Sequence, residues 1–563
     1  MVDSKLSRSI SWLLSVGAFL TTVIVWSYYT NDPVNTPKLA TLSLTAFACL
    51  GLIVSGRKKL STFINFKAVY TLCVCFVLWS LISILLSDTA ITDGFYGAWG
   101  RNTGFLAYFC LVLLLIASAN VVDLRNIKRV INSLYFAGVT NLVYFVLTQF
   151  NIQLIPWNNA YKRILGTFGN PNFVGAFMGL FGIILFSRIL DKKESKRNRL
   201  LSIGFLIITA YEIKLSLASQ GVVVLCGGIG LLLFFYIKNE LSNLVIWLYS
   251  VPMFFIGLLA LFGALNKGPL GPFIYKPSIT FRGQYWHAAW EAGIRHPIFG
   301  VGMDSFGYWY GRVRTAESII YPGPETTTNA AHNIYLDLLA YGGFPLFILF
   351  ISLNILVIIK AITITFRSKE FDLQAVTLVT LWVAFQIQSL ISINQIGIAI
   401  WGWILSGLIL GYKIESQIIQ DTRIGKFIKS EKRGRNATLK NKEISFVPCI
   451  LIGLVGLIIG IQPLLADSSW NRAIRPIYPE TLAAQSKVWP LSYMRVMHAS
   501  SIYTQNGKPE IGLELAKFAS KKFPNVLMVW QIMFNNPTLS DTERKLVKEN
   551  LHRLDPKNPE YFL

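Results

Sequence analysis

Two residues whose side chains could take part in a reaction, Arg282 and His332, fall in a long polar loop, residues 267–336, between apolar segments long enough to cross a bilayer. Arginine presents a fixed fork of donors that suits phosphate, and it stays charged at any relevant pH. A histidine just before an apolar run could accept a proton or bond an oxyanion. The alternatives are a lipid-headgroup anchor for Arg282 and a capping or loop-bonding role for His332.

A second polar turn, RILGTFGNPN at residues 163–172, precedes another apolar run. It brings Arg163 and Asn172 to the start of that run, and its glycines allow close backbone approach. The same letters also fit a simple helix start, with Asn170 as the cap and Pro171 at the first helical position. We leave both interpretations open.

The composition is that of an integral membrane protein. Mean hydropathy is +0.50, hydrophobic residues make up 53% of the chain, and charged residues only 14%. The apolar residues come in runs that predict thirteen membrane-spanning helices. These spans are approximately 11–29, 38–55, 68–87, 104–119, 130–150, 172–190, 200–218, 221–237, 243–264, 337–359, 373–390, 395–412 and 446–465.

The net charge of +23 is concentrated in alternate loops, with the largest Lys and Arg cluster at residues 423–442. This distribution argues against nucleic-acid binding and marks those loops as cytoplasmic. We therefore expect a cytoplasmic N-terminus on an uncleaved first span, and an extracytoplasmic polar loop and C-terminal tail. All six cysteines fall in apolar spans or at their ends, which favours packing over disulfides or metal binding.

These patterns predict an all-α polytopic membrane protein of about 12–14 transmembrane helices, with a large extracytoplasmic loop and a small helical extracytoplasmic C-terminal domain. In the tail, a turn at residues 506–509 separates two helical patterns, as in a tetratricopeptide-like unit. A small helical cap without repeat ancestry is the equal alternative. The expected regions are N-terminal transmembrane helices (1–160), a transmembrane core (161–413) with the loop 267–336, a basic cytoplasmic linker (414–445), a last span (446–465) and the tail (466–563).

Three motifs resemble the O-antigen ligase and polymerase superfamily of lipid-linked glycan transferases. RILGTFGNPNFVGAF is similar to the family's Arg-x-x-Gly-Thr-Phe-x-Asn-Pro-Asn segment. Arg282 with Gly293 fits Arg-x10-Gly, followed by the family-like HPIFGVGMDSF. His332 with Gly343 fits His-x10-Gly within His-Asn-x-Tyr-Leu. The resemblance covers about residues 160–410.

The resemblance implies a GT-C-like fold in the bacterial cytoplasmic (inner) membrane. The implied reaction needs no metal or cofactor and transfers a glycan from undecaprenyl pyrophosphate to an acceptor hydroxyl on the outer face. Arg282 would hold the pyrophosphate and stabilise it as it leaves. His332 would orient or deprotonate the acceptor hydroxyl, or bind phosphate itself. The substrate-binding residues implied by the motifs are Arg163, Asn172, Lys214, Gln220 and Asn333.

The chain departs from the family pattern in two places. Many members carry Ser-Arg-Gly where this chain has Ser219-Gln220-Gly221, so one cation is missing, and Lys214 is the candidate replacement. Many members also carry a glutamate two residues before the glycine of the histidine motif, where this chain has Tyr341. Both departures concern the chemistry of the site.

The expected partners are the lipid-linked donor, membrane lipids, an acceptor that is a glycan, a lipid or a protein, and a protein partner at the tail. A transporter or flippase is the first rival function. It predicts ionisable residues at mid-span and broken helices in matching halves, whereas the polar residues here gather at one outer face. The second rival is a non-catalytic scaffold of a surface-glycan assembly system, which the absence of an arginine at Gln220 keeps open.

Overall fold

The structure, a computed structural model, describes residues 4–56, 67–156, 159, 163–366, 371–413, 445–475 and 479–562. Every regular element in these ranges is a helix, which confirms the all-α prediction. The helices of the membrane body are α1 (Ser4–Val23), α2 (Asn35–Gly56), α3 (Lys67–Leu86), α5 (Phe105–Ala119), α6 (Leu124–Gln149), α7 (Pro171–Leu190), α8 (Lys196–Ser216), α9 (Ser219–Glu240), α10 (Asn243–Ala264), α15 (Ile334–Phe366), α16 (Leu373–Ser389), α17 (Ile396–Gly411) and α19 (Val447–Gly460).

Nine helices in the described ranges are long and apolar enough to cross a membrane, and α5, α16 and α17 are shorter apolar helices. A helix covers each of the thirteen predicted spans. The first begins and ends earlier than the predicted 11–29, because its first turn is polar. Helix α8 falls outside the nine, since Glu212 and Lys214 add charge to an already basic helix. The basic linker 414–445 lies almost entirely outside the described residues.

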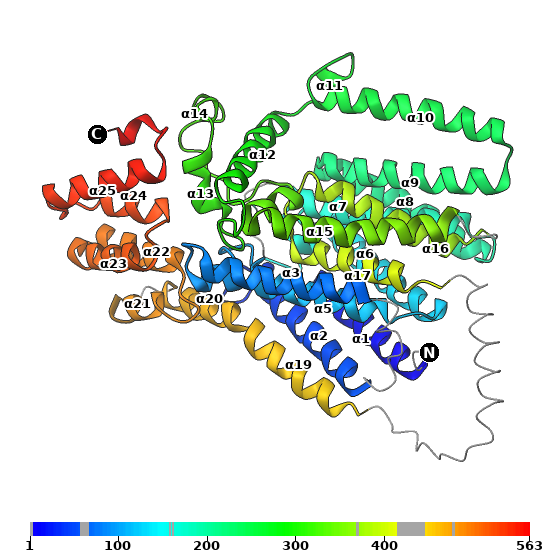
Figure 1. The fold of residues 1–563 in the computed structure, drawn as a ribbon, viewed down its shortest axis with the longest axis horizontal. Helices are drawn as coiled ribbons and strands as arrows, with labels where there is room; N and C mark the ends of the chain where they lie inside the picture. Colours follow the sequence, from blue (N-terminus) through cyan, green and yellow to red (C-terminus); the bar gives the residue numbers. More distant parts are fainter. Residues whose placement is uncertain are drawn as a thin grey trace.

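Most of the body helices pack side by side in one bundle, with the C-terminal helices at one end and the N-terminus toward the other (Figure 1). The broadest contacts join α2 with α19, α7 with α8 and α9, α5 with α17, and α1 with α6. Helix α10 lies apart from the bundle (Figure 1), and its apolar residues are exposed. Such a surface is suited to lipid.

The polar stretch 267–336, predicted as an extracytoplasmic loop, contains four helices. These are α11 (Gly271–Ile274), α12 (Pro277–Arg295), α13 (Phe306–Val313) and α14 (Glu317–Ile320). In α12 the buried residues recur at helical spacing and face α15. They are Tyr285, Ala288, Ala289, Ala292 and Gly293. Arg282 is therefore carried by a packed helix.

The glycines of the two x10-Gly motifs let α12 and the turn that follows it approach α15 closely. A Cβ at Gly293 would lie 2.6 Å from Cγ of Leu339. Gly343 has φ +68°, and a Cβ there would lie 2.4 Å from the carbonyl oxygen of Pro297. Gly342 and Gly343 also interrupt the helical backbone of α15, just before Pro345. The motif glycines therefore set the packing between the Arg282 helix and the His332 helix.

Replacing Gly293 by valine forces a branched side chain into this contact, because Leu339 is fully buried. We expect the free energy of unfolding to fall by about 1–3 kcal/mol. Gly283→Val is the matched control in the same helix, since a Cβ there meets no atom within 4 Å. Thermal unfolding in detergent measures both variants, and equal stability of the two would contradict this account.

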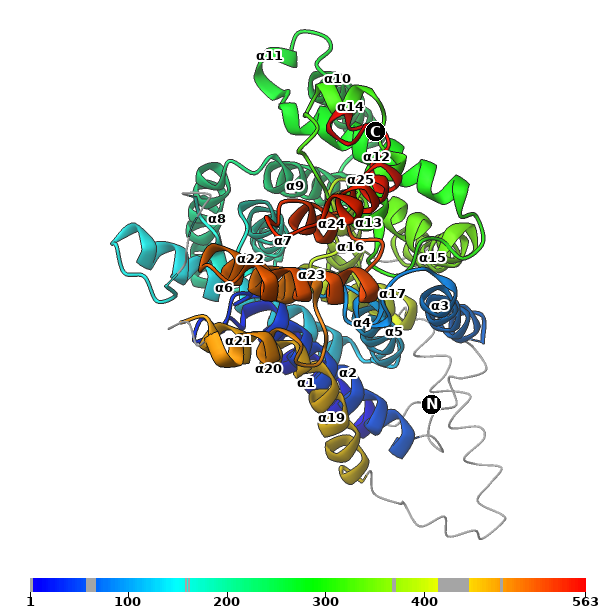
Figure 2. The ribbon, with the colours of Figure 1, turned by 90° about the vertical axis from the view of Figure 1, so that its left-hand side faces the viewer.

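The regular elements of the described tail are helices, and the tail packs against the end of the bundle that carries α12 to α14 (Figures 1 and 2). Its helices are α20 (Gln462–Ala473), α21 (Pro479–Ser486), α22 (Tyr493–Gln505), α23 (Pro509–Lys522), α24 (Leu527–Phe534) and α25 (Asp541–Leu554). The predicted turn at residues 506–509 does separate two helices, α22 and α23, that pack on each other. Tetratricopeptide ancestry stays a prediction.

A buried ion pair fastens the tail to α13. Arg314, at the end of α13, donates to both carboxylate oxygens of Asp555, at 2.9 and 2.5 Å, and the two side chains are only 1% and 3% exposed. Lys557 donates to the carbonyl of Arg314, and Arg312 donates to Asn525. Tail and loop therefore form one packed unit.

Asp555→Asn leaves the Arg314 guanidinium buried without its counter-charge. Breaking one side of a buried pair costs about 3–5 kcal/mol, so we expect the tail to detach and become sensitive to protease. Lys517→Gln is the control, because its ion pair with Glu543 lies on the surface of the same tail. Limited proteolysis measures the effect, and wild-type resistance in Asp555→Asn would overturn the proposed anchor.

Candidate functional site

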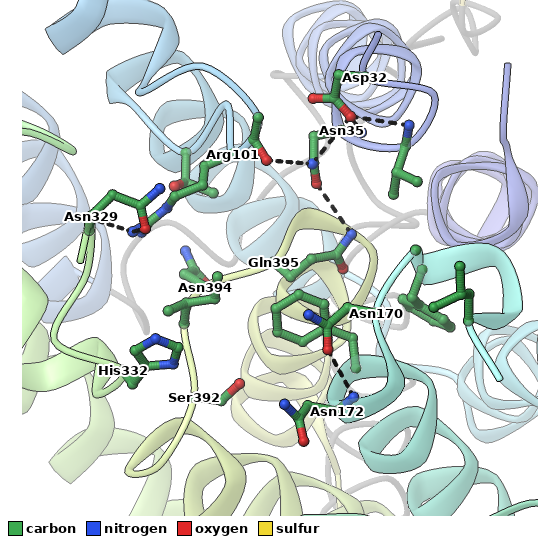
Figure 3. A pocket seen from close by; sticks show the side chains of 18 of the residues that line it. Asp32, Asn35, Arg101, Asn170, Asn172, Asn329, His332, Ser392, Asn394 and Gln395 are labelled. Carbon is green, nitrogen blue, oxygen red and sulfur yellow. Dashed lines mark hydrogen bonds between the residues drawn. The ribbon is translucent and has the colours of Figure 1, made fainter. Parts of the chain in front are cut away.

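A polar cavity of about 400 Å³ lies where four turns and the His332 segment meet (Figure 3). The turns are those between α1 and α2, before α5, before α7 and between α16 and α17. Its wall is rich in amide and hydroxyl side chains. The polar lining residues are Asp32, Asn35, Arg101, Thr103, Asn170, Asn172, Gln220, Asn329, His332, Ser392, Asn394 and Gln395.

The backbone around His332 is held from both sides. Asn333 caps α15, its side-chain oxygen accepting from the N–H groups of Tyr335 and Leu336. The N–H of Ala331 donates to Asp337 at 2.7 Å. His332 itself has φ +57°, in the left-handed region that non-glycine residues rarely adopt. A strained residue persists only where its surroundings fix it, so the position of the imidazole is set by packing.

The His332 ring stacks against Tyr285 of α12, with ring centroids 5.9 Å apart. Arg282 lies one turn before Tyr285 and is near enough to His332 to affect its protonation. Burial lowers the pKa of His332 to about 4, and the positive charges of Arg282 and Arg101 contribute. At neutral pH the imidazole is therefore uncharged, and it is a weak base.

Three cations lie near the turn between α8 and α9. Lys276 donates from Nζ to the carbonyl of Leu217, between these two helices, at 2.8 Å. Burial lowers the pKa of Lys276, and the nearby charges of Arg163 and Arg282 lower it further. Among the described residues none of the three forms an ion pair with a carboxylate. We call Arg163, Lys276 and Arg282 the cation group.

Residues 204–351 match the family model described as O-antigen ligase. The chain contains an O-antigen ligase domain. The match supports the predicted superfamily over residues 204–351, and with the apolar helices it supports a multi-pass membrane protein. No curated protein matches the chain.

The matched region contributes Gln220, Asn329 and His332 to the cavity, which is completed by turns outside that region. Lys276 and Arg282 also belong to the matched region but do not line the cavity. The predicted residues Asn172 and Gln220 line the cavity. Gln220 donates to the carbonyl of Ile391, so it joins two parts of the wall. Arg163 lines a neighbouring cavity of about 310 Å³ that shares Leu165 with the first.

Two predicted substrate-binding residues lie elsewhere. Lys214 is exposed on α8 and does not line either cavity. Lys276, at the start of α12, reaches the α8–α9 turn and donates to the carbonyl of Leu217 there. Asn333 is buried and caps α15, so it acts on His332 through the backbone and does not line the cavity.

A buried ion pair that sequence reasoning missed supports the ligase domain's histidine segment. Arg101, before α5, lies 3.1 Å from Asp304, and the two side chains are 5% and 0% exposed. Tyr341 donates to Asp304 and accepts from Arg101. Arg101 also donates to the carbonyl of Asn329 at 2.6 Å. Tyr341, where many relatives have glutamate, thus links this pair to α15.

Within the described structure, Asp304 is the only carboxylate that forms an ion pair with Arg101, and Asp304→Asn removes its charge. An uncompensated buried guanidinium costs about 3–5 kcal/mol, so we expect a lower melting temperature and a displaced His332 segment. Glu291→Gln is the control, since its pair with Arg295 is exposed and contributes about 0.5 kcal/mol or less. If Asp304→Asn is as stable in detergent as the wild type, the ion pair does not stabilise the structure and the prediction is wrong.

Proposed function

We propose that the protein is a membrane glycosyltransferase that moves a glycan from undecaprenyl pyrophosphate to an acceptor hydroxyl, without metal or cofactor. The observation that carries the proposal is that His332, in the wall of an amide-lined cavity, is near Arg282, a member of the cation group. The O-antigen ligase match supports the same reaction class.

The cation group suits a diphosphate leaving group. Arg163 and Arg282 offer forked donors, and Lys276 adds a point charge. Since none of the three is neutralised by a described carboxylate, their field is available to an anionic ligand. Charge that develops on the leaving oxygen as the glycosidic bond breaks is stabilised most by cations already in place.

The cavity suits the sugar that is transferred. Its volume of about 400 Å³ lies within the range of small-molecule sites. Amides such as Asn172 and Asn394 both donate and accept, which matches sugar hydroxyls. His332 joins this wall as a neutral imidazole, so it can hydrogen-bond the reacting hydroxyl or a phosphate oxygen without adding charge.

The distribution of buried charge favours surface chemistry over transport. Lys38, Glu212 and Asp337 are the buried charged residues in body helices of the described structure. Lys38 and Asp337 lie in the first turns of α2 and α15, and Glu212 lies near the end of α8. None is at a helix centre, where a translocation path would need it. We propose that these ends face the outside of the bacterial cytoplasmic membrane, with the N-terminus cytoplasmic.

The acceptor is a glycan, a lipid or a protein that reaches the cavity from the outer face. The tail and α13 form one packed unit beside this site, so the tail is placed to hold an acceptor or a protein partner. A polymerase, which lengthens a glycan chain, and a ligase, which attaches a finished chain once, would use the same chemistry. The two are distinguished by the product that they form.

Complementation of a deletion strain tests the proposed function. We expect wild type to restore the surface glycan, and Arg282→Ala and His332→Ala to reduce it by about 10²–10³-fold at equal membrane levels. Arg295→Ala is the control in the same helix, because this residue pairs with Glu291 away from the cavity. Glycan profiles on gels measure the outcome.

The banding pattern adds a second result. Short chains in the variants would identify a polymerase, whereas full-length chains without their anchor would identify a ligase. If both variants restore the profile fully, the site has no catalytic role and the transporter or scaffold function takes its place.

A further inference from the structure

The cavity contains one carboxyl group that the proposed function has not used. Among the residues lining it, Asp32 alone carries a carboxylate. Asp32 precedes α2 and lies across the cavity from His332, with Asn394 and Gln395 between them (Figure 3). It comes from a part of the chain outside the ligase match.

One oxygen of Asp32 has a structural role and the other does not. Oδ1 accepts from the N–H groups of Val34 and Asn35, at 3.1 and 2.9 Å, and so caps the start of α2. Oδ2 has no hydrogen-bond partner, although the residue is only 6% exposed. A buried carboxylate oxygen without a partner is costly, and the cap needs only Oδ1. Oδ2 is therefore a buried acceptor whose hydrogen-bonding capacity is not used within the described structure.

The surroundings of Asp32 give it the proton affinity of a base near neutral pH. Burial raises the pKa of Asp32 to about 6, because its effect is larger than that of the hydrogen bonds from Asn35 and Val34, which lower the pKa. Asp467 of α20 accepts from the Asp32 N–H and raises the pKa further. The facing cation is Lys38 of α2, whose ammonium is held by the carbonyls of Thr21 and Thr22. Asp32 is thus mostly ionised at pH 7 and readily protonated.

His332 is poorly suited to take a proton in the same reaction. Its pKa is about 4, and a proton on the imidazole would be repelled by Arg282 and Arg101. The hydroxyl that attacks the sugar must nevertheless lose its proton. A carboxylate on the opposite wall avoids this repulsion.

We propose that Asp32 accepts the proton of the acceptor hydroxyl during glycan transfer. This inference rests on the proposed function. The acceptor oxygen forms a bond to the anomeric carbon, and the bond from that carbon to the pyrophosphate oxygen breaks. The electron pair leaves with undecaprenyl pyrophosphate beside the cation group, and the hydroxyl proton passes to Oδ2 of Asp32.

The arrangement fits a direct displacement. In such a reaction the attacking and leaving oxygens lie on opposite sides of the reacting carbon. His332 is at one wall of the cavity and Asp32 is at the other (Figure 3). Arg282 is near enough to His332 to lower its pKa. The amides between them would hold the sugar, so the acceptor enters from the α1–α2 side with its hydroxyl near Asp32.

The test compares Asp32→Asn with wild type, as full-length protein in detergent, using the lipid-linked glycan that accumulates in the deletion strain. Asparagine keeps the Oδ1 cap but is no longer a base. We expect the turnover rate to fall by about 10²–10⁴-fold, with donor binding unchanged. In wild type the rate should fall as pH drops through about 6, because protonated Asp32 cannot accept a proton, and this acid limb should vanish in the variant.

Asp123→Asn is the matched control, since Asp123 caps α6 in the same way and lies outside the cavity. Turnover of Asp32→Asn within threefold of wild type, with the acid limb intact, would overturn the proposal. If the variant does not fold, the wild-type profile decides, and an acid limb absent near pH 6 overturns it equally. Failure of the proposed function is distinct, because then wild type transfers nothing or Arg282→Ala is as active as wild type.

Discussion

The buried pair between Arg101 and Asp304 is the interaction on which the site depends. It joins the turn before α5 to the turn before α13, and Tyr341 ties both to α15. Through Asn329, the same arginine holds the segment that ends in His332. A buried ion pair adds little net stability compared with apolar residues in the same positions. It nevertheless fixes one arrangement of the chain, because any other arrangement would leave a buried charge without its partner.

The packing of glycines has a comparable effect on a larger scale. Gly293 and Gly343 let α12 and α15 touch where any side chain would push them apart. Arg282 and Tyr285 are thereby brought to His332. The tail adds a further constraint from outside, since Arg314 and Asp555 join it to α13 directly after the Asp304 turn. Residues far from the cavity thus determine the geometry within it.

The sequence predicted the elements that have a local pattern. Apolar runs located the thirteen helices, and the motif spacing located Arg282 and His332. The helices within 267–336 were not predicted, although Tyr285, Ala288 and Ala292 have the three- to four-residue spacing of one helix face. The Arg101–Asp304 pair could not be found, because single charges two hundred residues apart carry no sign of their contact. Lys276 was missed for the same reason, since its place depends on how α12 meets the α8–α9 turn.

The cavity is assembled from three parts of the chain: the first third, the matched region and the turn between α16 and α17. The matched region, 204–351, supplies His332 and most of the cation group, whereas the wall that holds Asp32, Asn35 and Asn172 comes from the first third of the chain. In the proposed reaction, the lipid-linked donor and the acceptor are therefore bound by different segments of the chain. A chimera that exchanges only the matched region would change the donor while the host chain keeps its acceptor, so one fold can diversify the two specificities independently.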